Sequence, residues 1–320
     1  MKIISMETTG SPDVLRLREA EDPQPGPGQV VVDVSAIGVN FMDIGTRRGM
    51  NAMPLPLAPG VEGAGRVAAV GEGVTDLAVG QRVAWVFAWG SYASKVVMPA
   101  TSAVRVPDDI DDRVAASLMM QGLTASHFAT DFYPVQQGDI ALVHAAAGGL
   151  GQILSQIIKL RGGTVIGRVS SESKVRAAKA AGADHVIIDA DGDFAATVLE
   201  LTDGEGVHVV YDGSGPATFD GSLSSLRRAG TFCWYGPVLG GPGGLDIMSL
   251  PRSVKIGYAV FFDHIHTPKL LRERTQRLFD WVREGKLVIA PATEFALADA
   301  ARAHAAIESR ATTGKLLLIP

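Results

Sequence analysis

Cysteine is nearly absent from this sequence, since Cys233 is the single cysteine among 320 residues. A disulfide within the chain is excluded, and so is a zinc or iron–sulfur site built from several cysteines. The sequence also lacks an apolar run of the ~20 residues that cross a bilayer. Residues 1–7 contain too few apolar side chains for the core of a signal peptide. We therefore expect a cytoplasmic protein without a membrane segment.

A basic excess is absent too. Lysine and arginine number 29 against 34 acidic residues, and the formal net charge is −5. A general nucleic-acid binder normally carries a basic balance, so this function is disfavoured. Hydrophobic residues make up 47 % and charged residues 20 %, which excludes disorder of the whole chain. At ~150 residues per domain, the length favours two domains.

The first part of the chain is rich in predicted strands. Runs of β-branched and apolar residues predict strands at 30–37, 61–70 and 82–87. Segments rich in proline and glycine separate them, and the 37 glycines of the chain indicate many tight turns. The sequence therefore predicts a compact β domain over the first ~120 residues, with a short helix at 41–48.

The sequence pattern changes near Thr124, where predicted strands begin to alternate with predicted helices. The strands are expected at 139–144, 164–169, 185–188, 207–211 and 231–235, and the helices at 149–161, 173–181, 194–201 and 219–226. Such alternation implies βαβ crossovers and a parallel sheet that is covered on both faces. This is the pattern of a doubly wound nucleotide-binding domain. The remainder predicts a strand at 255–262, helices at 268–283 and 297–309, and a strand at 316–319.

A dinucleotide-binding fingerprint follows the strand that ends at His144. Its spacing is Ala146-x-Gly148-x-x-Gly151, with alanine at the first glycine position. The residues expected to contact the cofactor here are Ala147, Gly148, Gly149, Leu150 and Gly151. Gly148 lets the backbone approach a pyrophosphate, and the helix that follows offers free N–H groups to it. A plain tight turn is the alternative, but the position between a strand and a helix favours cofactor binding.

The end of the second strand of this domain indicates which dinucleotide binds. An NAD site places an acidic residue there, whereas this chain has Arg168, Ser170, Ser171 and Lys174 at and after that point. Such groups suit the 2′-phosphate of NADP. The alternative is that a serine caps the next helix while Lys174 is a surface residue, and Glu172 gives this some support. The missing acid favours NADPH.

Five blocks of sequence resemble one family. They are GVNFMD at 38–43, PGVEGAG at 59–65, QGLTA at 121–125, HAAAGGLG at 144–151 and ESRATTGK at 308–315. The chain resembles the zinc-free, zeta-crystallin-like quinone oxidoreductases of the medium-chain dehydrogenase/reductase superfamily. The resemblance implies an α/β fold, with a GroES-like β domain at 1–123 and 263–320 and an inserted Rossmann domain at 124–262. It places the active site in the cleft between these domains.

The resemblance also implies a site without metal. Zinc-dependent relatives place Cys, His and Cys where this chain has Asn40, Val61 and Gln121, and valine cannot bind zinc. The loop at 83–91 is too short and cysteine-free for the structural zinc lobe of those relatives. His264 and His266 lie close in sequence, but two ligands without a third indicate a polar surface turn.

The family pattern assigns roles to further residues. Asn40 would lie by the nicotinamide, although it could also cap the helix at 41–48. Thr124 would contact the nicotinamide end or cap the helix that it opens, and Tyr235-Gly236 would pass under the adenosine or ribose. Arg310 would reach the cofactor phosphates or be a surface cation at a helix end. The chain departs from some members at Gly45, which opens the cleft, and at Asp189, which is unfavourable beside a 2′-phosphate.

These expectations give one leading function and two alternatives. The leading function is hydride transfer from NADPH to a quinone without metal, with Asn40 and Gln121 at the catalytic centre and the Asn40 amide as a donor to the developing anion. An enal or enone reductase would need a proton donor, for which Tyr92 is the candidate. A crystallin-like nucleotide-binding protein without catalysis is the third reading. The strand-like segment 254–261 predicts a homodimer joined through sheet edges.

Overall fold

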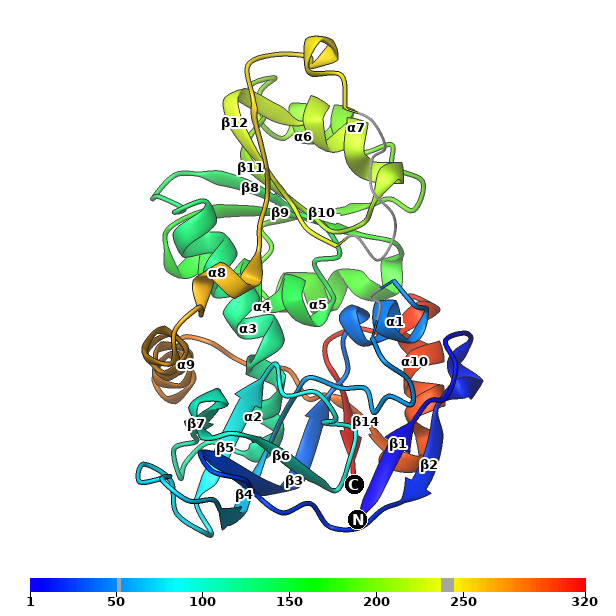
Figure 1. Cartoon of the computed structure of the whole chain (residues 1–320). Helices are drawn as coiled ribbons and strands as arrows, with labels where there is room; N and C mark the ends of the chain where they lie inside the picture. Colours follow the sequence, from blue (N-terminus) through cyan, green and yellow to red (C-terminus); the bar gives the residue numbers. More distant parts are fainter. Residues whose placement is uncertain (51–52, 237–244) are drawn as a thin grey trace. The chain divides into compact units, whose positions relative to one another are not determined.

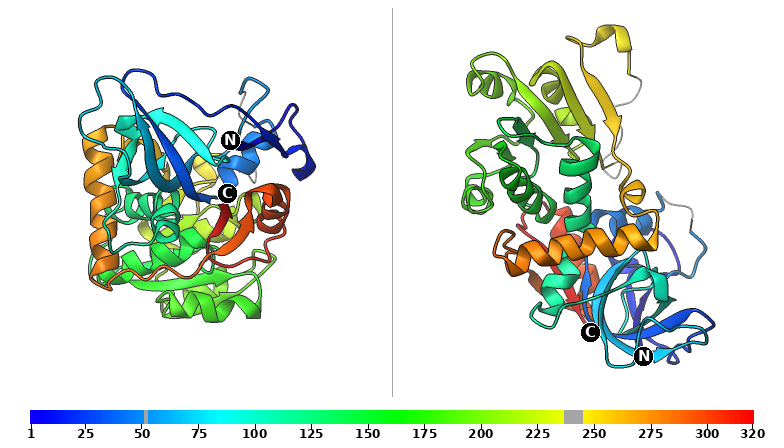
Figure 2. Two further views of the ribbon diagram at one scale, coloured as in Figure 1. Left: turned by 90° about the horizontal axis from the view of Figure 1, so that it is seen from below. Right: turned by 90° about the vertical axis from the view of Figure 1, so that its left-hand side faces the viewer.

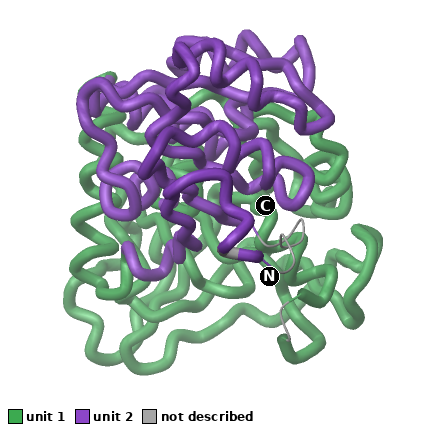
Figure 3. The backbone as a smooth tube through the Cα atoms, turned by 90° about the horizontal axis from the view of Figure 1, so that it is seen from above, with its two compact units in different colours: residues 1–123, 265–285, 289–320 green, residues 124–264, 286–288 purple. Residues whose placement is uncertain are grey.

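The chain divides into two compact units (Figure 3). The computed structural model describes residues 1–50, 53–236 and 245–320. Unit 1 comprises residues 1–123, 265–285 and 289–320, and unit 2 comprises residues 124–264 and 286–288. The predicted Rossmann range was 124–262. Both chain termini therefore belong to unit 1, and unit 2 is inserted between its parts.

Unit 1 is built around a mainly antiparallel sheet with the strand order β14-β15-β3-β4-β5-β7 and β6 paired to β3 (Figure 1). Its strands are β3 (Gln29–Gly38), β4 (Glu62–Val70), β5 (Arg82–Val86), β6 (Lys95–Pro99), β7 (Ala103–Arg105), β14 (Thr293–Ala296) and β15 (Leu316–Ile319). A separate two-stranded sheet joins β1 (Lys2–Ser5) to β2 (Arg16–Glu19). The C-terminal strand β15 thus pairs with β3 from the beginning of the chain, as expected for a domain that the chain leaves and re-enters.

Close packing of β3 on β4 depends on glycine. A Cβ atom at Gly65 would lie 2.0 Å from the carbonyl oxygen of Asp33 on the neighbouring strand. One at Gly38 would lie 2.0 Å from Oε1 of Glu62. The Glu62 side chain therefore occupies the space that the missing side chain of Gly38 leaves. This contact fixes the position of a buried carboxylate at the start of β4.

Helices complete unit 1. They are η1 (Pro12–Val14), α1 (Phe41–Arg47), η2 (Ala100–Ser102), α2 (Asp112–Leu118), α9 (Pro268–Arg283), η7 (Leu297–Asp299) and α10 (Ala300–Glu308). The side chain of Thr267 accepts a hydrogen bond from the N–H of Leu270 at 3.2 Å and so caps α9. Helix α9 packs against α2 and β7, although it comes much later in the chain (Figure 2).

Unit 2 contains a parallel sheet with the order β10-β9-β8-β11-β12-β13. Its strands are β8 (Ile140–Val143), β9 (Thr164–Val169), β10 (His185–Ile188), β11 (Val207–Asp212), β12 (Leu226–Trp234) and β13 (Lys255–Tyr258). Counted from β8, this is the 3-2-1-4-5-6 order of a dinucleotide-binding fold. The strand order reverses between β8 and β11, so a ligand is expected at the carboxyl ends of these two strands. The predicted fold class is confirmed.

Helices cover both faces of this sheet, with α4 and α5 on one face and α6 and α7 on the other (Figure 1). The helical segments of this part of the chain are α3 (Met120–His127), η3 (Phe128–Phe132), α4 (Gly149–Leu160), η4 (Glu172–Lys174), α5 (Val175–Ala180), α6 (Ala195–Glu200), α7 (Pro216–Ser224), η6 (Ile247–Ser249) and α8 (Phe261–His264). Phe194, Val198, Phe219 and Leu223 pack with Phe232 in the core under α6 and α7. Within the described residues, no helix is long and apolar enough to cross a membrane.

Some element predictions were wrong. Residues 255–262 form a short strand and then helix α8, not one strand. The predicted helix at 219–226 begins earlier, at Pro216, and ends at Ser224, because a proline at the first helical position starts it. Strand β12 begins at Leu226, within the segment that we predicted to be helical. Thr124 lies inside α3, so it does not cap a helix that it opens.

Candidate active site

The fingerprint loop lies at the carboxyl end of β8, where the strand order reverses. His144 follows the strand, Ala145 adopts a left-handed backbone with φ of 49°, and Gly148 precedes α4 as its N-cap. The first N–H groups of a helix have no carbonyl partner within it, so those of Gly149 and Gly151 are free to receive an anion. The helix dipole adds positive potential at the same point.

The two glycines of the fingerprint have different surroundings. A Cβ atom at Gly151 would lie 2.4 Å from the carbonyl oxygen of Ala145 and 2.7 Å from the Cα atom of Ala146. Gly151 therefore lets α4 pack directly on the loop. At Gly148 the closest described atom to such a Cβ is the Ala145 oxygen at 3.2 Å. The space over Gly148 is thus open for the cofactor pyrophosphate, and the loop fits a dinucleotide.

Three buried side chains tie the loop to the rest of the sheet. The hydroxyl of Ser222 on α7 donates to Oδ2 of Asp212 at 2.7 Å and lies 3.0 Å from Nε2 of His144. Burial lowers the pKa of His144 to about 4 despite the nearby Asp212 carboxylate, so the imidazole is neutral. Asp212 also accepts from the N–H of Ser214 at 2.7 Å. These bonds hold the ends of β8 and β11 in fixed register at the point where the order reverses.

Arg168 and Asp189, at the ends of β9 and β10, form an ion pair. Nε of Arg168 donates to Oδ2 of Asp189 at 2.6 Å, and the guanidinium lies 5.1 Å from the centre of the Phe194 ring. Oδ1 of Asp189 also accepts from the N–H groups of Asp191 and Gly192 at 3.0–3.1 Å. Burial alone would raise the pKa of Asp189, but the hydrogen bond and charge of Arg168, together with the N–H groups of Gly192 and Asp191, lower the pKa below its usual value. The negative charge that we expected to disfavour a 2′-phosphate is therefore compensated.

The predicted 2′-phosphate residues after β9 lie in one short turn. Nζ of Lys174 donates to Oγ of Ser170 at 2.8 Å. The hydroxyls of Ser171 and Ser173 lie 3.0 Å apart. No side-chain hydrogen bond from Ser171 caps this turn, which weakens the capping alternative. The segment after the carboxyl end of β9 thus carries an ammonium group and three hydroxyls between Ser170 and Lys174.

Tyr235 and Gly236 follow β12. A Cβ atom at Gly213 would lie 2.4 Å from Cε2 of Tyr235, so the ring packs directly on the backbone after β11. The ring centre lies 4.7 Å from that of Phe128. Gly236 has φ of 99°, in the region that favours glycine. Both residues thus border the carboxyl end of the sheet, the place predicted for the adenosine or ribose.

Asn40 in unit 1 belongs to a buried polar cluster. Its Nδ2 donates to Oε1 of Glu62 at 2.7 Å, and its Oδ1 accepts from Nζ of Lys315 at 3.0 Å. Nζ of Lys315 also lies 2.6 Å from Oε1 of Glu62, and the N–H of Met120 donates to Oε2 at 2.6 Å. Asn40, Glu62 and Lys315 are all at most 5 % exposed. The amide is therefore held in one orientation by two charged partners.

Asn40 also stands at the N-terminus of α1, as its alternative reading predicted. The carboxylate of Asp43 accepts a hydrogen bond from the N–H of Asn40 at 2.9 Å. Helix α1 ends at Arg47, one residue before the predicted end. Gly45, one of the departures from the family pattern, is buried inside this helix.

Glu62 and Lys315 are site residues to which the sequence analysis gave no role. Both lie inside the blocks that carry the family resemblance, and each is a charged residue next to an apolar run. That placement is the signal that could have singled them out, because a buried charge needs a partner. Their pairing joins positions 253 residues apart, which no local pattern predicts.

The other two positions that hold metal ligands in zinc-dependent relatives also lie in unit 1. Val61 is fully buried. Oε1 of Gln121 is buried without a hydrogen-bond partner among the described residues. An amide acceptor in this state is ready for a donor from a ligand, although an amide oxygen is a poor zinc ligand.

Tyr92 is enclosed within unit 1. Its hydroxyl donates to Oδ2 of Asp43 at 3.1 Å and lies 2.9 Å from Nε2 of His304, and the side chain has no exposed surface. Burial raises the pKa of Asp43 to about 7 and lowers the pKa of His304 to about 4. A hydroxyl held in this chain is badly placed to give a proton to a substrate. The geometry therefore speaks against Tyr92 as a direct proton donor and for a structural role.

Two further predictions concern charged or polar residues at the ends of helices. Arg310 follows α10, is exposed and has φ of 55°. A contact between Arg310 and the cofactor phosphates stays a prediction.

His264 was expected in a polar surface turn, which is wrong. It is fully buried at the end of α8, and its Nδ1 lies 2.7 Å from Oδ2 of Asp131. His266, two residues further on, is exposed.

Comparison with known proteins defines the class first. Residues 26–108 match the alcohol dehydrogenase GroES-like domain, and residues 181–318 match the zinc-binding dehydrogenase family. Together with the two units described above, these matches place the chain among the medium-chain dehydrogenases/reductases.

Individual relatives define the family. A quinone oxidoreductase of Pseudomonas aeruginosa is 38 % identical over 323 residues, covering 100 % of this chain and 99 % of that protein. A 2-haloacrylate reductase of Burkholderia sp. is 37 % identical, covering 97 % and 96 %. The crystal structure of Escherichia coli quinone oxidoreductase complexed with NADPH has a TM-score of 0.97 at 34 % identity, covering 100 % of both chains. The chain belongs to the zinc-free quinone oxidoreductase family, as its sequence predicted.

Proposed function

We propose that this protein is an NADPH-dependent reductase that transfers a hydride to a quinone without a metal. The relatives named quinone oxidoreductase support the acceptor, and the NADPH in the Escherichia coli structure supports the cofactor. The observation that carries the proposal is the Asn40–Glu62–Lys315 cluster at a position where zinc-dependent relatives bind metal. NADPH supplies the hydride when bound, and the protein orients it and excludes water.

The cluster suits a quinone acceptor for an electrostatic reason. A quinone spreads incoming charge over a conjugated ring, so neutral donors are enough to stabilise it. The second Nδ2 proton of Asn40 is one such donor, because Glu62 takes only one of the two. A simple ketone or alcohol develops a full alkoxide charge and needs a Lewis acid. Gln121 is proposed as a second polar contact. Its amide oxygen would accept a hydrogen bond from a hydroxyl or an amide N–H of a bound ligand.

Cofactor selectivity rests on the turn after β9. We propose that Lys174, Ser170 and Ser171 bind the 2′-phosphate, while Arg168 serves mainly to neutralise Asp189. The loop residues 147–151, together with Thr124, Tyr235 and Gly236, are proposed to contact the remaining parts of NADPH. Arg310 is proposed as a phosphate contact.

A second function is favoured by one comparison. The 2-haloacrylate reductase reduces, by its name, an activated alkene, and its 37 % identity to this chain lies within the 35–38 % range of the quinone oxidoreductases. Hydride addition to such a double bond needs a proton at the α-carbon. Since Tyr92 is enclosed, that proton would have to come from water or from a side chain other than Tyr92.

The test is steady-state oxidation of NADPH with benzoquinones, enals and 2-haloacrylate, before and after dialysis against a chelator. We expect turnover with quinones, negligible alcohol oxidation, and activity that survives chelation. A higher kcat/KM for 2-haloacrylate than for every quinone would favour the alkene reductase. Activity that is lost with a stoichiometric metal would contradict the metal-free reading. Gly148→Val is the control, because its side chain would fill the space over the loop and abolish cofactor binding.

We also propose that the protein is a homodimer joined through the β13 edge of the unit 2 sheet. The cytoplasmic location stays a prediction from the sequence.

A further inference from the structure

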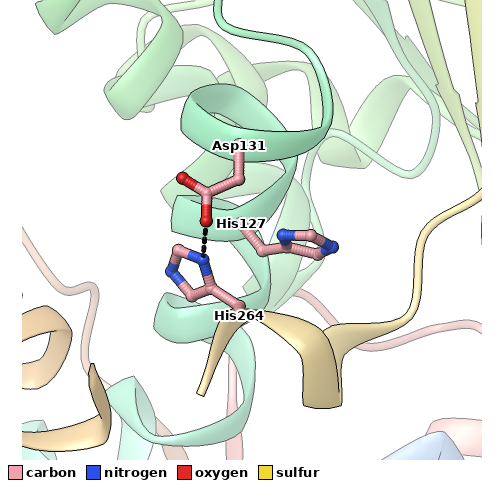
Figure 4. A group of neighbouring side chains, drawn as sticks. All are labelled: His127, Asp131 and His264. Atoms are coloured by element: carbon pink, nitrogen blue, oxygen red, sulfur yellow. Dashed lines mark hydrogen bonds and ion pairs between the residues drawn. The ribbon is translucent and has the colours of Figure 1, made fainter. Parts of the chain in front are cut away.

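Three side chains of unit 2 form a cluster that the proposed reaction does not use (Figure 4). They are His127, Asp131 and His264, and one potential ligand atom from each lies within 4.8 Å of those of the other two. Nδ1 of His264 lies 2.7 Å from Oδ2 of Asp131, and the two imidazole centres are 5.2 Å apart. The cluster shares no residue with the fingerprint loop or with the Asn40 cluster.

The local helix geometry brings the first two residues together. His127 is the last residue of α3, and Asp131 lies in the π-helical segment η3 that continues it. Side chains four residues apart lie on one side of a helix. A π-helical turn is rare, and such turns occur often at functional sites. His264 reaches them from α8, 133 residues later in the chain.

The burial of the three side chains is graded. His264 is 0 % exposed and His127 is 7 % exposed, whereas 36 % of the Asp131 side chain is exposed. Phe128 and Phe132 contact the His127 ring at centre distances of 5.9 and 6.2 Å. The two imidazoles are therefore buried among aromatic rings, and the carboxylate of Asp131 is the member of the cluster with the most exposed surface.

We propose that His127, Asp131 and His264 bind a divalent cation of the zinc type. Two imidazoles and one carboxylate are a ligand set that zinc takes in proteins, with water at the fourth position. Zinc–ligand bonds of ~2.0–2.2 Å put tetrahedral ligand atoms roughly 3.3 Å apart. The ligand atoms of the three side chains lie up to 4.8 Å apart, which is more than this spacing. Side-chain rotations that move these atoms by roughly an ångström would bring them to the spacing of a zinc site. Oxygen-only cations such as magnesium fit two imidazoles poorly.

This site would differ in role from the catalytic metal of zinc-dependent relatives. Asn40, Val61 and Gln121 all belong to unit 1, whereas the three proposed ligands all belong to unit 2. The ion would cross-link the α3–η3 segment to α8, directly after the edge strand β13. Its removal should lower the melting temperature and leave hydride transfer to quinones in place. The cation site and the proposed function can therefore fail independently.

The experiment is calorimetric titration of chelator-treated, full-length protein with ZnCl2 near pH 7.5. We expect one equivalent of zinc to bind, and His264→Ala and Asp131→Asn to weaken the affinity at least tenfold. The matched controls are His266→Ala and His185→Ala, which remove exposed histidines of this chain and should leave the affinity unchanged. Co²⁺ is the spectroscopic probe, because a tetrahedral site with nitrogen ligands gives intense visible absorption that both ligand variants should lose.

Several outcomes would overturn the site. These are wild-type protein that binds no zinc, ligand variants that bind as tightly as wild type, and affinity that is lost in a control variant instead. In the first case, His264 and Asp131 form only an ion pair. If His264→Ala fails to fold, Asp131→Asn decides the question, because it changes a partly exposed side chain and keeps its shape. A zinc-dependent rise in melting temperature of wild type, absent in Asp131→Asn, is the independent readout.

Discussion

Lys315 and Lys95 each hold a carboxylate at the same distance, 2.6 Å, in very different surroundings. The Lys315 and Glu62 side chains are 3 % and 0 % exposed, whereas those of Lys95 and Asp33 are 26 % and 58 % exposed. Removal of one partner from a buried pair leaves the other charge uncompensated in a medium of low polarity. An exposed pair loses little, because water and salt replace the partner.

We therefore predict that Lys315→Met lowers the free energy of unfolding by about 3–5 kcal/mol. Lys95→Met, the matched control, should cost at most about 1 kcal/mol. Urea unfolding of both variants measures the difference. In Lys315→Met the kcat/KM for quinones should also fall, since the Asn40 amide loses the ammonium group that orients its oxygen. Equal costs for the two variants would show that the Asn40 cluster is not sealed from water.

Cofactor selectivity is the second property set by single residues. Lys174→Ala should raise the KM for NADPH roughly tenfold to a hundredfold, because a charge-assisted contact contributes ~1.5–3 kcal/mol and less where water screens it. The KM for NADH should stay the same, since NADH carries no 2′-phosphate. Arg168→Ala serves as the comparison: it breaks the pair with Asp189 and should weaken both cofactors. Wild-type protein with equal KM values for both cofactors would refute the NADPH preference.

Residue roles were predictable from the sequence where a local motif defines them. The fingerprint runs from the end of β8 into the first turn of α4 as expected, with Gly148 as the N-cap and Gly151 inside the helix, since strand, turn and helix are contiguous. The partners of Asn40 were not predictable, because Glu62 on β4 and Lys315, directly before β15, are distant in sequence and meet only where β4 and β15 pair with β3. The enclosure of Tyr92 was not predictable either, because Asp43 on α1 and His304 on α10 are distant from it in sequence.

At the scale of elements, a buried chain of hydrogen bonds joins α1, α10 and the segment before β6. Asp43, Tyr92 and His304 are its members. Burial raises the pKa of Asp43 from 3.8 to about 7, so the folded protein holds this proton more tightly than the unfolded chain. The resulting stabilisation is complete below about pH 4 and is lost as the pH rises through 7. His304, with its pKa lowered to about 4, acts in the opposite direction between pH 4 and 6.5.

Asp43→Asn removes the carboxyl group whose pKa is raised, and it keeps a side-chain oxygen that can accept a hydrogen bond from the N–H of Asn40. Wild type loses unfolding free energy as the pH rises from 4.5 to 8, because the pKa of Asp43 is about three units higher in the folded than in the unfolded chain. The variant does not lose it, so its unfolding free energy should rise by roughly 2–4 kcal/mol relative to wild type over this range. His304→Gln should show the reverse trend, a relative loss as the pH rises from 4 to 6.5. Urea unfolding at several pH values measures both. Parallel curves for wild type and Asp43→Asn would show that the pKa of Asp43 is not raised.

Element boundaries were predictable where one periodicity holds without interruption. The ranges of β9, α9 and β15 were predicted correctly from β-branched runs and from apolar residues at helical spacing. The prediction of one strand over residues 255–262 was wrong because a short apolar run does not distinguish a strand from a helix. There the chain leaves the sheet at Tyr258 and turns into α8 so that His264 can reach Asp131, a tertiary contact with no local signal.

At the scale of the whole molecule, the two edges of the unit 2 sheet are protected differently. Charged pairs flank the edge strand β10, with Asp184 bound to Lys159 and Asp189 bound to Arg168. The opposite edge, β13, continues into exposed apolar side chains. These are Tyr258, Val260 and Phe262, at 52 %, 40 % and 56 % exposure. Among the described residues, no strand pairs with the outer side of β13. An unpaired strand edge beside apolar surface favours pairing with a second copy, whereas charges oppose it.

We therefore predict a homodimer in which the β13 strands of two copies pair about a two-fold axis. Light scattering after size exclusion at micromolar concentration should give twice the chain mass of 33.6 kDa. Tyr258→Lys places a charge on the edge and should shift the protein toward monomer. Val288→Lys is the control, since Val288 is a 67 % exposed apolar residue of the same unit that hydrogen-bonds to Gln156 of α4. A wild-type monomer, or a dimer that Tyr258→Lys leaves as stable as Val288→Lys does, would place the interface elsewhere or remove it.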